Sequence, residues 1–214
     1  MGNHRISRGA VCAVALVLAA VASAHASKRA SNRFHFTGQY VEGCTCMPPC
    51  TCEMTGLEGG CQGVGAFEFT GGSFNGQSIA GCKIAYATEP GKWVDLIIDA
   101  PANRRKACEA FARKAGGAFG KIGTVTSGKI SIIHHGYTYD LKVDGGKVMA
   151  LHAVPILGLD KKTPLTYSNI QDPTHPTVMQ GKTVTGSYHL GSHQFTLKDS
   201  NAFFNEHLNV NGKF

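Results

Sequence analysis

The 214-residue sequence lacks the short motifs that mark familiar catalytic centres. It has no Gly-x-Ser-x-Gly elbow, no His-Glu-x-x-His pair, no Walker loop and no Cys-x-x-Cys-His haem site. Its glycine pairs fall in turn-like stretches, and none connects a strand to a helix as a nucleotide-binding loop does. The sequence therefore favours a binding protein over an enzyme.

Long apolar runs are also missing beyond the N-terminus. The one such run, from Ala10 to Ala22, follows Arg5 and Arg8 and precedes an Ala24-His25-Ala26 cleavage site. This order is that of a secretory signal peptide, and the run is too short to span a bilayer. We expect residues 1–26 to be removed and the mature chain to be periplasmic or secreted, with no membrane span.

Dense clusters of one charge are absent as well. Lys and Arg total 21 against 14 Asp and Glu, and the basic residues are scattered in groups of two or three. An exported chain with such a surface is not a nucleic-acid binder by default. The expected partners are a metal ion and a metal-receiving or membrane partner protein.

Residues 27–214 suit one domain with a substantial core. One segment, 102–115, has a helical apolar stripe that includes Cys108, and Gly116-Gly117 ends it. The rest alternates short β-favouring runs with turn residues, a polar loop at 161–181 and a mostly polar tail at 201–214. The predicted fold is α+β: a mostly antiparallel sheet, barrel-like or sandwich-like, with one main helix packed on it. Strands are predicted at 34–41, 64–70, 79–87, 92–99, 129–134, 137–144, 147–156, 183–190 and 193–198.

The chemistry of the chain is concentrated in a cysteine-rich loop at 43–61. Of the eight cysteines, Cys12 falls in the signal peptide, which leaves seven. Four of these form two Cys-x-Cys pairs separated by Met47-Pro48-Pro49. Alternate side chains of an extended segment point the same way, so each pair can present two sulfurs together. The candidate metal ligands are Cys44, Cys46, Cys50 and Cys52, with Met47, Met54 and Cys61 as further candidates.

Sulfur donors select Cu(I), zinc or iron–sulfur clusters. The spacing is neither that of a zinc finger nor that of a common ferredoxin. The two methionines favour Cu(I), because thioether is a good ligand for Cu(I) and a poor one for zinc, which stays the alternative metal. Disulfides are the competing interpretation in an oxidising compartment, with Cys44–Cys61 or Cys52–Cys82 as possible bridges. A thiol-disulfide oxidoreductase is a third.

The run GQYVEGCTCMPPCTCE resembles the opening of a bacterial family called domain of unknown function 1326. Members of that family have a strand, a Glu before the first cysteine and a Cys-x-Cys-x-x-x-Cys-x-Cys core. They continue with a Gly-Cys step, here Gly60-Cys61, and later with a Pro-Gly turn, a helix and a Gly-Gly exit. The family name implies no activity. The sequence therefore predicts an exported soft-metal protein, with copper favoured, that buffers or delivers its metal; the alternatives are a disulfide-stapled binding module without metal and an oxidoreductase.

Overall fold

The strand that leads into the cysteines is longer than its aromatic run predicts. The computed structural model describes residues 31–55 and 60–214, so the predicted signal peptide lies outside the described residues. Strand β1 (Arg33–Cys44) contains the predicted segment and carries the chain as far as the first cysteine of the loop. Its even-numbered side chains Phe34, Phe36 and Tyr40 are buried, which fixes one face of the strand in the core.

The described chain from Asn32 to Phe214 forms one unit. The strands make a single sheet in the order β6-β5-β4-β2-β1-β12-β11-β9-β8-β7, with β3 beside β2 and β10 beside β11. All neighbours are antiparallel except β5 and β6, so the prediction of a mostly antiparallel sheet with one main helix is confirmed. The other strands are β2 (Gly63–Phe74), β3 (Gln77–Ser78), β4 (Lys83–Glu89), β5 (Trp93–Asp99), β6 (Lys121–Ser127), β7 (Ile130–His135), β8 (Thr138–Val143), β9 (Met149–Pro155), β10 (Thr166–Ser168), β11 (Thr177–Leu190) and β12 (His193–Lys213).

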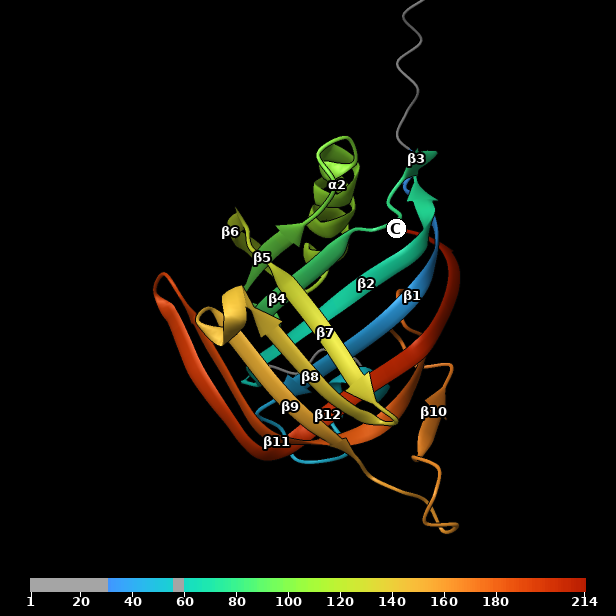
Figure 1. Ribbon diagram of the computed structural model, residues 1–214, viewed down its shortest axis with the longest axis vertical. Helices are drawn as coiled ribbons and strands as arrows, with labels where there is room; N and C mark the ends of the chain where they lie inside the picture. Colours follow the sequence, from blue (N-terminus) through green and yellow to red (C-terminus); the bar gives the residue numbers. More distant parts are fainter. Residues whose placement is uncertain (1–30, 56–59) are drawn as a thin grey trace, which may run out of the picture. The chain divides into compact units, whose positions relative to one another are not determined.

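The sheet is strongly curled into a half-barrel (Figure 1). Register shifts interrupt the pairing of β1 with both of its neighbours and of β11 with β9. Such bulges bend strands and increase their twist. At Gly38, beside both shifts in β1, the backbones of β1 and β2 approach each other closely. A Cβ atom there would lie 2.0 Å from the carbonyl oxygen of Glu68. Only glycine fits between the strands at that position.

The curled sheet buries a separate apolar cluster on each face. On one face the helix α2 (Arg105–Gly116) packs Phe111 edge-to-face against Phe36 and Phe69, with ring centroids 5.7 Å and 5.3 Å apart. On the other face Ile97 of β5 shares a cluster with Ile130 of β7, because the sheet curls over itself. The cysteine loop belongs to the cluster on the helix face.

Three local predictions need correction. The helix begins at Arg105 rather than at residue 102, since residues 102–104 form a turn. The predicted loop at 161–181 contains β10 and the start of β11. The predicted polar tail at 201–214 is the second half of β12, which pairs with β1 along its length.

The 3-10 turn η1 (Asp144–Gly146) connects β8 to β9, as its glycines predict. No helix within residues 31–55 and 60–214 is long and apolar enough to cross a membrane.

Candidate metal and thiol centre

The cysteine loop is the connection between β1 and β2, and its base is closed by the pairing of these strands. Cys44 ends β1 opposite Gly63 of β2, so Cys61 arrives beside it, two residues before β2 begins. The N–H of Thr45 donates to the carbonyl oxygen of Gln62 at 2.8 Å, and the N–H of Gln62 donates to Thr45 Oγ1 at 2.9 Å. Strand register therefore places the first and last cysteines of the loop together.

The middle of the loop is held by a residue from the far end of the chain. Asn201 of β12 lies opposite Cys44, on the other side of β1 from β2. Its N–H donates to the carbonyl oxygen of Cys46 at 2.8 Å, and its Oδ1 accepts from the N–H of Cys50 at 3.2 Å. Asn201 is fully buried, so these hydrogen bonds are shielded from water. They hold the loop segment from Cys46 to Cys50 against β12.

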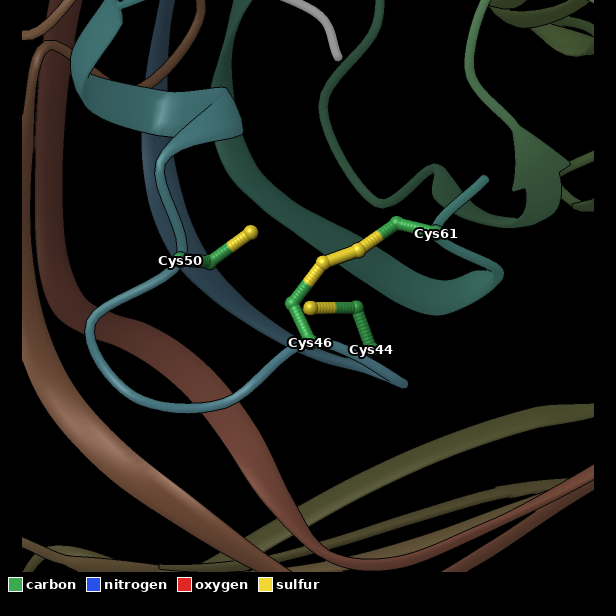
Figure 2. Close-up of side chains that lie close together, drawn as sticks. All are labelled: Cys44, Cys46, Cys50 and Cys61. Carbon is green, nitrogen blue, oxygen red and sulfur yellow. A yellow bond between two sulfur atoms is a disulfide. The ribbon is translucent and has the colours of Figure 1, made fainter. Parts of the chain in front are cut away.

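Four sulfur atoms converge as a result. The Sγ atoms of the cluster all lie within 4.8 Å of one another, and Figure 2 shows the four side chains pointing together. Sulfurs around one tetrahedral ion with bonds of about 2.3 Å lie about 3.8 Å apart. Four sulfurs within 4.8 Å are close enough to surround one ion, provided that any two that are bonded to each other are first reduced and move apart. The members of the cluster are Cys44, Cys46, Cys50 and Cys61.

Two of the four sulfurs are joined. Cys46 and Cys61 form a disulfide, whereas Cys44 and Cys50 are buried free thiols. The thiols of Cys44 and Cys50 form a hydrogen bond with each other, and this bond, burial and the charge that Cys44 would carry raise the pKa of Cys50 well above its ordinary value. The Cys50 thiol therefore keeps its proton at neutral pH until a metal or an oxidant displaces it.

A carboxylate shares the cavity beside these thiols. The cavity has a volume of about 30 Å³, enough for a water molecule or an ion, and Glu42, Cys50 and Cys52 are among the residues that line it. The hydroxyl of Tyr86 donates to Glu42 Oε2 at 2.7 Å and lies 2.9 Å from the hydroxyl of Tyr40. Glu42 also contributes to the raised pKa of Cys50, because two adjacent negative charges repel.

The remaining predicted ligands lie around the cluster. Cys52 is half-buried at the start of α1 (Cys52–Thr55) and lines the cavity, but it is outside the group of four. Met47 is 73% exposed, and Met54 is half-buried. The group of four thus contains Cys61, predicted only as a further candidate, in place of Cys52.

The two other cysteines form a second bridge. Cys108 on α2 is buried, as its position on the apolar stripe predicts, and it is joined to Cys82 just before β4. Neither of the bridges considered from the sequence, Cys44–Cys61 or Cys52–Cys82, is present between these described residues. The helix therefore has a covalent connection to the sheet, well separated from the cluster of four.

Sequence reasoning missed Asn201 and Tyr86 as parts of the site. Asn201 contacts the loop across 151 residues of sequence, and no local pattern indicates such a contact. Tyr86 looks like one more aromatic residue of a buried strand. The signal for Glu42 was present, since it precedes the first cysteine by two residues and so projects from the same face of the strand.

Comparisons with known proteins assign neither a family nor a function to this chain. No family model matches the chain, and no curated protein matches it. A solved structure of an acetoacetate decarboxylase aligns with 86% of this chain and 89% of its own, at 7% identity and a TM-score of 0.37. The enduracididine biosynthesis enzyme MppR, solved with the condensation product of pyruvate and imidazole 4-carboxaldehyde, aligns with 84% of this chain and 86% of its own, at 11% identity and a TM-score of 0.34. The cysteine cluster itself is therefore the feature that points to a function.

Proposed function

We propose that the protein is an exported soft-metal-binding protein that buffers or delivers copper, with zinc as the alternative metal. The observation that carries the proposal is the convergence of four Sγ atoms within 4.8 Å. In the reduced chain these atoms supply four thiolates around one point, and thiolates select soft and borderline ions. Export follows from the N-terminal signal and is part of the proposal.

Copper is favoured by the surroundings of the cluster. Two net negative charges remain when four thiolates surround a divalent ion, and the Glu42 carboxylate lies beside them in a partly buried site. Cu(I) accepts fewer thiolates and so leaves fewer charges. Met47, exposed at 73% next to Cys46, offers a thioether at the surface, where an incoming or outgoing Cu(I) ion can bind first.

A second candidate function is a disulfide-stapled binding module without metal. The specific observation in its favour is the pair of bridges, Cys46–Cys61 and Cys82–Cys108. In that case the first bridge closes the cysteine loop and the second fastens α2 to the sheet. Cys44 and Cys50 would then be buried thiols with no ligand.

The test is a competition titration of reduced, metal-free protein under anaerobic conditions, with a chromogenic Cu(I) chelator and separately with a zinc chelator. Wild type should bind one ion per chain. Cys61→Ser should weaken zinc binding strongly, whereas Cys52→Ser, half-buried at the same cavity but outside the group of four, should keep it. Circular dichroism checks that both variants are folded.

Two outcomes would overturn the proposal or part of it. If reduced wild type loses both metals to weak competitors as readily as a variant with all four cysteines changed to serine, the module without metal is the better account. If Cys52→Ser loses zinc and Cys61→Ser retains it, a metal is bound but by the ligand set of the two Cys-x-Cys pairs.

A further inference from the structure

The cluster contains two chemically different pairs of sulfurs. Cys46 and Cys61 are disulfide-bonded, whereas Cys44 and Cys50 are free, buried and hydrogen-bonded to each other. All four sulfurs nevertheless belong to one group within 4.8 Å. Opening the Cys46–Cys61 bond thus raises the number of thiols offered to an ion at this place from two to four, and closing it lowers the number to two.

We propose that the redox state of the Cys46–Cys61 pair selects which metal the protein holds. With the bridge closed, Cys44 and Cys50 form a two-thiolate site for Cu(I). With the bridge open, the four cysteines form a site that also holds zinc. The inference rests on the proposed metal-binding function and adds how the site is regulated.

The closed state suits Cu(I) by geometry. Two thiolates in line through one Cu(I) ion, with bonds of about 2.3 Å, lie about 4.6 Å apart. The sulfurs of Cys44 and Cys50 already face each other within 4.8 Å, and they admit the ion by moving apart and giving up the hydrogen bond between them. The product carries one net negative charge, against two for a divalent ion held by four thiolates, which suits two side chains that are only 7% and 3% exposed.

The closed state does not suit zinc. A structural zinc ion needs four ligands, and the disulfide sulfurs of Cys46 and Cys61 have no thiolate to give. Glu42 is the carboxylate that lines the cavity, and it would have to exchange its hydrogen bond from Tyr86 for a metal bond. The cavity of about 30 Å³ leaves little room for completing the shell with water.

Opening the bridge requires an external dithiol. A thiolate of that dithiol attacks Cys46 Sγ, the more accessible sulfur of the bridge, since Cys46 is half-buried and Cys61 is only 8% exposed. Cys61 leaves as a thiolate and takes a proton. The second thiol of the dithiol then displaces Cys46 and closes its own disulfide, so two electrons pass to the protein. The metal finally displaces protons from the four thiols.

The experiment compares wild type with the bridge closed and wild type with the bridge opened by a mild dithiol, both metal-free and anaerobic. Differential alkylation with mass spectrometry verifies each state and shows that the fully buried Cys82–Cys108 bridge is intact in both. Each form is titrated with Cu(I) and with zinc against chelators. X-ray absorption counts the sulfur neighbours of the bound ion.

The closed form should bind one Cu(I) with two sulfur neighbours, and its zinc affinity should be at least about 100-fold weaker than that of the open form. The variant Cys46→Ser/Cys61→Ser should behave as the closed form in either redox condition. The variant Cys44→Ser/Cys50→Ser, with its bridge closed, should bind neither metal. If a serine variant does not fold, the two states of wild type still decide the result.

Failure of this inference differs from failure of the proposed function. If the open and closed forms bind both metals with equal affinity, or if closed wild type loses Cu(I), the redox selection is wrong while metal binding stands. If the open form binds neither metal, the proposed function is wrong and the selection falls with it.

Discussion

The side chain of Asn201 holds Cys50 against the other cysteines although 151 residues separate the two in sequence. Its Oδ1 accepts from the N–H of Cys50 at 3.2 Å and from Nε2 of Gln180 at 2.8 Å. Gln180 Nε2 has two further acceptors, the carbonyl oxygens of Gly181 and Ala202, so it depends less on Asn201 than the N–H of Cys50 does. Asn201 thus acts on the cysteine loop more than on Gln180.

Replacing Asn201 with Ala should therefore loosen the loop. The variant leaves a buried N–H without its acceptor, which should lower the free energy of unfolding by about 2 kcal/mol. It should also weaken metal binding by about 10–100-fold, since Asn201 orients the loop that carries the ligands. Asn211→Ala, on an exposed position of the same strand, is the matched control. Chemical denaturation and the chelator competition measure the two effects, and an unchanged affinity would show that the loop needs no anchor.

The Cys82–Cys108 bridge makes a prediction about stability alone. The bridge closes a loop with a sequence separation of 26, and losing it should cost about 3.5 kcal/mol in the chain-entropy account. Cys82→Ser, Cys108→Ser and the double variant should lose nearly the same amount, because each removes one and the same bridge. Metal content should not change. Denaturation with the bridge intact measures the losses, and single-variant losses that add up in the double variant would argue against a bridge.

The sequence predicted the sheet, the helix and the cysteine centre because each has a local signal. Four soft donors within nine positions mark a thiol centre regardless of the fold. The choice of Cys61 over Cys52 had no such signal, since it follows from the register that places Cys44 opposite Gly63. The anchoring by Asn201 depends on the pairing of β1 with β12, which no pattern in the cysteine loop indicates.

The C-terminal strand was missed for a physical reason. Residues 201–214 contain four asparagines, which are depleted in strands, and these hid the apolar positions between them. Phe203, Phe204 and Leu208 are buried in the structure, because β12 is a central strand with β1 on one side and β11 on the other. Burial against both neighbours outweighs the weak β-propensity of the asparagines.

The proposed export makes a prediction about the N-terminus of the mature protein. Cleavage at the Ala24-His25-Ala26 site should leave Ser27 as the first residue, and cleavage at a second candidate site, Ala22-Ser23-Ala24, should leave His25. Mass spectrometry of protein from the periplasmic fraction measures this directly. A variant with Arg5 and Arg8 changed to Glu should stay unprocessed, whereas Arg33→Glu, beyond the signal, should be processed normally. Intact Met1 on periplasmic protein would contradict the signal peptide.

The pH at which the site loads with metal should depend on the proton of Cys50, with a smaller contribution from the carboxylate of Glu42. Metal binding displaces the proton of Cys50, whose pKa is raised by the hydrogen bond with Cys44, by burial, by the charge of Cys44 and by the charge of Glu42. Apparent metal affinity should therefore rise with pH, because fewer protons compete as pH increases. The dependence should be visible between about pH 6 and 8.

Glu42→Gln removes the nearby negative charge and keeps an oxygen for the hydroxyl of Tyr86. The pKa of Cys50 should fall, so the pH of half-loading should shift down, by less than about one unit because the contributions of Cys44 and of burial remain. Glu109→Gln, on helix α2, is the control and should cause no shift. The measurement is metal loading against a fixed chelator concentration as a function of pH. A shift upwards would mean that Glu42 binds the metal itself, since losing a ligand weakens binding while losing a repelling charge strengthens it.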